Sequence, residues 1–132
     1  MKTWVLFLTM LFMLSCDEER ESYVFAYGAE VKFKPGNSYV SEDNALVLQI
    51  NRISDSRCPE GVYCFWQGEV SVYCYLNQDK TEELVLRSHF KPVDTVGVHV
   101  FRLIDVKPYP KLNREIADSE RVVIMRIDKL EN

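Results

Sequence analysis

Four cysteines and two histidines are the side chains best suited to covalent or metal chemistry in this chain. Cys58 and Cys64 flank Pro59 and Gly61, which predict a tight turn that brings the two cysteine Cα atoms within disulfide range. The spacing is not the C-x-x-C of a redox-active pair, so we expect a structural disulfide. Closing so short a loop contributes roughly 2 kcal/mol in the chain-entropy model.

Cys74 occupies a position that predicts burial. In the alternating stretch around it, one face carries Val70, Val72, Cys74 and Leu76, and the other carries Ser71, Tyr73 and Tyr75. A cysteine on an apolar strand face is expected to be an inert, buried thiol. Spacing alone leaves a Cys64–Cys74 disulfide open as an alternative.

Catalytic and metal-binding motifs are absent from the sequence. His89 and His99 are far apart, and no His-x-His, His-x-x-x-His or Cys-x-x-Cys cluster predicts a zinc site. The chain also lacks a glycine-rich phosphate loop and a G-x-S-x-G elbow. Its net charge of −4, without a basic cluster, argues against nucleic-acid binding. We expect no metal, no cofactor and no enzymatic activity; an enzyme or metal-dependent factor using His89 or His99 is a third-ranked hypothesis.

One arginine and four aromatic residues in and after the cysteine loop form a candidate binding patch, which consists of Arg57, Tyr63, Trp66, Tyr73 and Tyr75. Such amphipathic side chains are suited to contact a protein or a glycan. A purely structural interpretation places Arg57 over the Trp66 ring as a cation–π pair, with Asp55 capping the turn or pairing with Arg57.

Short alternating segments separated by turn residues predict an all-β fold. The expected strands cover 23–27, 30–34, 38–40, 45–53, 66–76, 83–86, 96–106 and 120–130, with a bulge near Gly97 or Arg102 and 38–40 at an edge. We expect residues 23–132 to form one antiparallel, immunoglobulin-like β-sandwich of seven or eight strands, with a small barrel as the alternative.

The N-terminus reads as a targeting segment. Lys2 precedes an apolar run, 4–14, that is too short to span a bilayer and typical of a signal peptide. Ser15-Cys16 after this run resembles a bacterial lipobox, although Met13 and Leu14 depart from its usual residues. The resemblance implies a signal peptide at 1–15 and a lipidated Cys16 with a polar tether at 16–22. Cys16 would carry diacylglycerol and an acyl chain such as palmitate; ordinary secretion with cleavage elsewhere is the alternative.

The segment D-S-R-C-P, followed by C-x-W-x-G, resembles small, uncharacterised lipoproteins of the Bacteroidota type. A late Leu-x-x-V-x-P-x-P pattern, here Leu103, Val106, Pro108 and Pro110, is shared with them. Acidic residues directly after Cys16 resemble their signal for outer-surface display. The resemblance implies a β-rich domain anchored in the outer membrane and exposed at the cell surface, and it implies no activity.

These inferences favour a lipid-anchored, non-enzymatic binding or assembly module with an unknown ligand, held at the membrane through Cys16. The alternative is a hydrolase inhibitor or protective lipoprotein that presents the loop between Cys58 and Cys64.

Overall fold

The computed structural model describes residues 21–77 and 82–131, and the regular structure within them is almost entirely strand. The strands are β1 (Ser22–Phe25), β2 (Glu30–Phe33), β3 (Ser38–Ser41), β4 (Val47–Asp55), β5 (Val70–Leu76), β6 (Glu82–Arg87), β7 (Val93–Val96), β8 (His99–Lys107) and β9 (Val122–Lys129). A 3₁₀ turn, η1 (Asp118–Glu120), precedes β9. No helix among the described residues is long and apolar enough to cross a bilayer.

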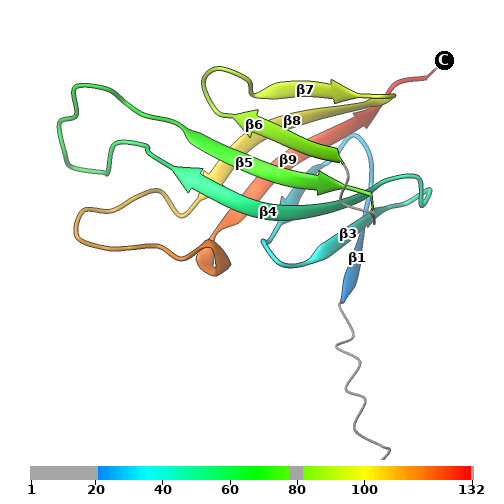
Figure 1. Ribbon diagram of the computed structural model, residues 1–132, viewed down its shortest axis with the longest axis horizontal. Coiled ribbons are helices and arrows are strands. Elements are labelled where there is room, and N and C mark those ends of the chain that lie inside the picture. The colour runs from blue at the N-terminus through cyan, green and yellow to red at the C-terminus, as the bar shows by residue number, and fades with distance from the viewer. Residues whose placement is uncertain (1–20, 78–81, 132) are drawn as a thin grey trace, which may run out of the picture.

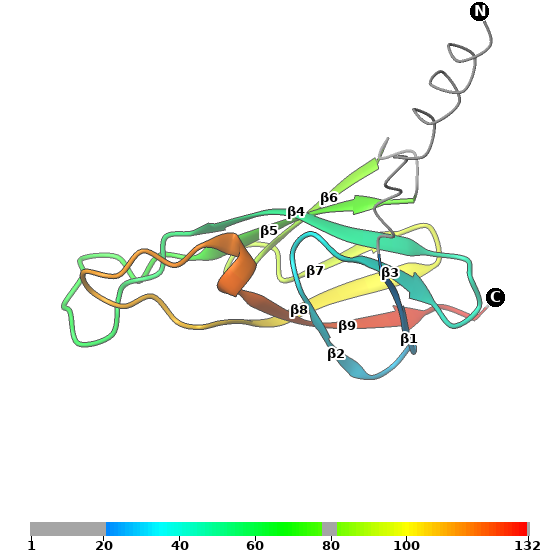
Figure 2. The same ribbon diagram turned by 90° about the horizontal axis from the view of Figure 1, so that it is seen from below.

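Two sheets pack face to face as a sandwich (Figures 1 and 2). One has the order β1-β3-β4-β5-β6 and the other β2-β9-β8-β7. The predicted all-β sandwich is therefore confirmed, and the alternative of a small barrel is wrong. The described residues form more strands than the seven or eight that were expected. An immunoglobulin constant domain interleaves its strands as A-B-E-D and C-F-G, whereas β3 to β6 and β7 to β9 are simple meanders, and β1 pairs parallel to β3.

The core lies between the sheets and follows the period-two pattern of the sequence. The residues predicted on the inner face of β5, Val70, Val72, Cys74 and Leu76, are fully buried. Leu48 and Ile50 of β4 meet Phe101 of β8 and Met125 of β9 in the same cluster. The last strand, β9, lies between β2 and β8 in its sheet.

One local prediction was wrong: the segment 38–40 does not form an edge, because β1 pairs with the outer side of β3. The bulge predicted near Gly97 or Arg102 is confirmed at the second place, since the pairing of β8 with β9 shifts register between Leu103 and Asp105. Gly97 lies instead in the turn between β7 and β8, which pair as a hairpin. The turn lets Val96 pack against the core that Phe101 and Leu103 enter from β8.

The meander places three connections at the same end of the sandwich, because each strand reverses the direction of the one before it. These connections are residues 56–69 between β4 and β5, 88–92 between β6 and β7, and 108–121 between β8 and β9. They lie together at the left of Figure 1, and the C-terminal end lies at the opposite side. We call these three connections the loop end.

Candidate functional site

The loop end is held together by contacts between its three connections. The backbone N–H of Glu60 donates to the carbonyl of Pro110 at 3.2 Å, which joins the first connection to the third. The rings of Trp66 and Phe90 stack with centroids 6.1 Å apart, which joins the first to the second. Residues far apart in sequence therefore form one surface.

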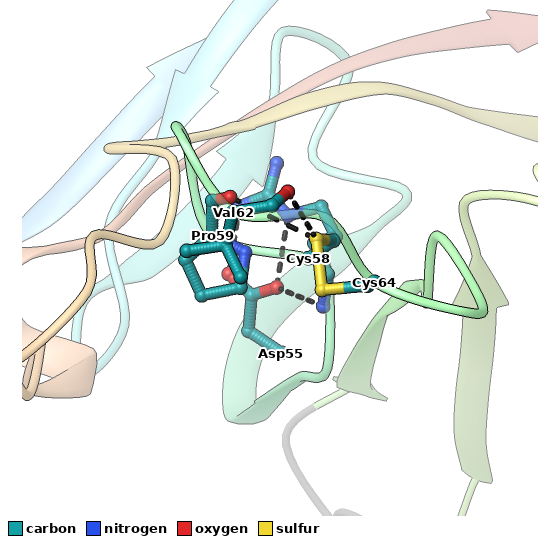
Figure 3. The surroundings of a disulfide bond; sticks show 6 residues. Asp55, Cys58, Pro59, Val62 and Cys64 are labelled. Atoms are coloured by element: carbon teal, nitrogen blue, oxygen red, sulfur yellow. Dashed lines mark hydrogen bonds and ion pairs between the residues drawn. A yellow bond between two sulfur atoms is a disulfide. The ribbon is translucent and has the colours of Figure 1, made fainter.

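The disulfide closes the first connection (Figure 3). Cys58 and Cys64 are bonded with their Cα atoms 5.9 Å apart, as predicted. Cys74 is a buried free thiol, so the Cys64–Cys74 alternative is excluded. Burial raises the pKa of the Cys74 thiol to about 12, which keeps it protonated and unreactive.

A buried ion cluster forms the base of this connection. Arg57 donates to both carboxylate oxygens of Asp55, at 2.8 and 2.7 Å, and Arg121 pairs with the same carboxylate. Burial of Asp55 opposes its ionisation, but the hydrogen bonds and charges of the two arginines outweigh it, so the pKa of Asp55 lies below its usual value. The predicted pairing of Asp55 with Arg57 is confirmed.

Arg57 exposes little of its surface at the loop end. Its side chain is buried, and its guanidinium lies 4.5 Å from the ring centroid of Tyr109. The cation–π partner predicted for Arg57, Trp66, was wrong: Tyr109, from the connection after β8, lies at this place instead. Arg57 thus has a structural role at the base of the loop end.

Trp66 belongs to a stack that joins the first two connections of the loop end. Phe90 lies between Trp66 and Arg87, whose guanidinium is 5.1 Å from the Phe90 ring centroid. Glu69 accepts hydrogen bonds from Arg87 and fixes its orientation. Trp66 remains more than half exposed while its ring is held in place.

Tyr63 and Phe65 are the most exposed large apolar side chains of the described residues, at 107% and 111%. They flank Cys64, whose side chain is bonded to that of Cys58. The disulfide therefore fixes the chain directly between the two exposed rings. The sequence analysis named Tyr63 and missed Phe65.

Tyr73 and Tyr75 lie on the outer face of β5, away from the core, as predicted. Both are partly buried, and the guanidinium of Arg52 lies 3.9 Å from the Tyr73 ring centroid. They belong to the strand face and not to the loop end. Cys16, the predicted lipidation site, lies outside the described residues.

Exposed apolar residues gather at the loop end. Besides Tyr63, Phe65 and Trp66, the exposed large apolar side chains there are Phe90, Tyr109 and Leu112. A hollow of about 200 Å³ lies beside them between Arg57, His89 and Tyr109. Nothing in the sequence pattern indicated that Phe90 and Leu112 would join this surface, since only the strand order brings their connections together.

A second polar cluster lies at the opposite end of the sandwich. The Tyr27 hydroxyl donates to Asp43 at 3.0 Å and lies 3.1 Å from His99 Nε2, and Lys129 pairs with Asp43. Burial, and then the charge of Lys129, lower the pKa of His99, with Asp43 opposing. Within residues 21–77 and 82–131, no three His, Cys, Asp or Glu side chains are grouped so that they could hold a metal ion.

No protein-family model, curated protein or solved structure matches this chain.

Proposed function

We propose that this protein is a lipid-anchored lipoprotein of the outer membrane that displays a non-enzymatic binding module at the cell surface. Signal peptide 1–15 directs export, and the acylated Cys16 holds the sandwich at the membrane. The domain contacts a protein partner through its loop end. The position of Cys16 after the apolar run supports the anchor, and the loop end supports the binding role.

The observation that carries the binding role is the gathering of exposed aromatic side chains on a rigid base. Stable monomeric domains rarely gather large apolar side chains on one exposed surface unless it binds something. Aromatic residues are enriched where interfaces concentrate their binding energy. Here they are held by the disulfide, by the Asp55 ion cluster and by the Trp66–Phe90 stack, so little conformational entropy is lost on binding.

The anchor is tested by the intact mass of the protein from membranes of its native host, with and without reduction. We expect the mass of residues 16–132 plus acyl chains, rising by two hydrogens when the single disulfide is reduced. An unlipidated mass with cleavage elsewhere would remove the anchor from the proposal.

The binding role is tested by photo-crosslinking on intact cells that display the full chain. We replace Tyr63 with the photoreactive p-benzoyl-phenylalanine and, as the control, replace the exposed Val24 of β1 in the same way. The proposal expects a discrete adduct from position 63 and none from position 24. Equal labelling at both positions, or none at either, would contradict it.

An inhibitory role for the same surface is favoured by one specific observation: the fully exposed Tyr63 lies in a loop closed by a disulfide, and the fully exposed Phe65 follows it directly.

A further inference from the structure

We propose that the end of the sandwich opposite the loop end holds a binding site for a small, uncharged and largely apolar molecule that carries a hydroxyl group. The site is a hollow between the two sheets, and His99 lines it as the acceptor for that hydroxyl. The hollow is separate from the loop end, so this inference goes beyond the proposed function and does not depend on it.

The hollow has an apolar floor between the sheets. Its volume is about 480 Å³, within the range of roughly 300–1,000 Å³ that small-molecule sites occupy. The floor consists of three buried core side chains, Leu46, Leu76 and Phe101. Val96 and Val98, on either side of the turn between β7 and β8, form a wall. This turn lies at the right of Figure 1, at the end opposite the three connections.

The side chain of His99 belongs to the inner face of its sheet. His99, Phe101 and Leu103 are alternate residues of β8, and Phe101 and Leu103 are buried in the core. Alternate residues of a strand share one face, so the imidazole of His99 lies between the sheets, where the sandwich opens. Its ring centroid is 6.5 Å from that of Phe101, on the floor of the hollow.

One nitrogen of His99 is held by the polar cluster at this end. Nε2 lies 3.1 Å from the Tyr27 hydroxyl, which donates its own hydrogen to Asp43 at 3.0 Å. The Tyr27 oxygen is therefore an acceptor toward His99, and Nε2 carries the ring hydrogen. Burial, and then the charge of Lys129, lower the pKa of His99 from 6.5. The ring is thus uncharged at neutral pH, and Nδ1 keeps its lone pair.

Nδ1 of His99 is the atom that selects the ligand. Among the residues that the structure describes, no group donates a hydrogen bond to it. A lone pair on an uncharged imidazole accepts a hydrogen bond and cannot donate one. A hydrocarbon, an ether or a ketone would cover this nitrogen and leave it unpaired, at a cost in free energy. The ligand that fits must therefore bring a hydrogen-bond donor.

The charges around the hollow disfavour an ionised ligand. The described residues that line it include one carboxylate, that of Glu82, and no Lys or Arg, so an anion would meet a like charge. Lys129, whose charge lowers the pKa of His99, repels a cation from the same ring. Burying either charge against the apolar floor also costs free energy. A hydroxyl group supplies the donor without a net charge.

The test compares two photoreactive probes, para-(hydroxymethyl)benzophenone and para-(methoxymethyl)benzophenone, in which a methyl group replaces the hydroxyl hydrogen. Each is irradiated with the full-length protein, purified from its native host in mild detergent, and the adducts are located by peptide mass spectrometry. We expect the hydroxymethyl probe to label the lining segments 45–46, 76–77 or 96–99 and to reach saturation. The methoxymethyl probe should need an about fivefold higher half-saturating concentration, because it lacks one neutral hydrogen bond.

Two histidine variants assign this difference to the imidazole. His99→Phe keeps an aromatic ring but removes Nδ1. It should raise the half-saturating concentration of the hydroxymethyl probe about fivefold and leave that of the methoxymethyl probe unchanged. His89→Phe makes the same change at the loop end and should match the wild type.

Equal half-saturating concentrations of the two probes on the wild type, or no saturable labelling of the hollow, would overturn the inference; this comparison requires no variant to fold. So would adducts confined to the exposed rings of the loop end, at 63–66, 90 or 109–112. Unchanged labelling of a folded His99→Phe variant would overturn it as well, because Nδ1 would not be the acceptor. The adduct from position 63 on cells tests the proposed function separately.

Discussion

Asp55 and Arg121 form an ion pair that joins the two sheets of the sandwich. Asp55 ends β4 in the five-stranded sheet, and Arg121 lies directly before β9 in the other. Their side chains are 1% and 10% exposed. Because Arg57 shares the same carboxylate, one acidic group pairs with two nearly buried cations at the base of the loop end.

Asp55→Ala should therefore destabilise the protein strongly. It leaves the buried guanidinium groups of Arg57 and Arg121 without their common partner, and breaking a buried pair in this way costs about 3–5 kcal/mol. The free energy of unfolding from urea titration measures the loss. As the control, Asp128→Ala removes the more exposed pair with Arg126 and should cost at most about 1 kcal/mol. Equal effects of the two variants would show that the buried cluster contributes no more than a surface pair.

Gly68 is required by a close approach of two backbones. Its φ is +69°, and a Cβ added there would lie 1.8 Å from the Ser56 carbonyl oxygen. Gly68→Ala should lower the free energy of unfolding by more than about 3 kcal/mol or prevent folding. The backbone atoms around the new Cβ must shift, and the alanine must also adopt a strained, positive φ. Gly61 has a φ of +77° but no atom within 4 Å, so Gly61→Ala should cost only about 1 kcal/mol. Comparing the thermal unfolding of the two variants separates the steric clash at position 68 from the strain of a positive φ, which both positions share. Similar losses of stability in the two variants would rule the clash out.

His99 should make the protein less stable in mild acid. Its pKa in the folded protein is lowered from 6.5, so the unfolded chain binds the proton first as the pH falls. The free energy of unfolding should therefore decrease below about pH 6.5 and level off once the pH is below the folded-state pKa. Lys129, Asp43 and Tyr27 are the titratable groups around this ring.

Urea unfolding between pH 8 and pH 5 measures this dependence. His99→Gln should flatten the curve in that window. A slope that survives His99→Gln would assign the dependence to another group.

Cys74 should be unreactive in the folded protein. Its thiol is fully buried, and burial raises its pKa to about 12. Iodoacetamide should therefore add no group to the native protein at neutral pH and one group after denaturation without reductant, as measured by intact mass. Rapid native labelling would show that the core opens at β5.

Several features followed from the sequence because they depend on neighbouring residues. Alternation around Cys74 predicted its burial, and Pro59 and Gly61 predicted a turn short enough for the Cys58–Cys64 bond. The partner of Arg57 was predicted wrongly because Trp66 is close in sequence, whereas Tyr109 is brought there from the far side of β8. The edge position of 38–40 was wrong because pairing with β1 is a long-range event that side-chain pattern does not encode.

The sequence by itself determined the class of fold, the inner faces of the central strands and the disulfide, because burial and short loop closure follow from periodicity and spacing. It also supports the expectation of an anchor at Cys16. Only the tertiary structure decided that three connections share one end, that Asp55 pairs with arginines next to both sheets, and that exposed Tyr63 and Phe65 lie at the same end as Trp66 and Phe90. These relations depend on strand order. Strand order is set by the packing energy summed over the whole core, and this sum cannot be calculated from any local segment of the sequence.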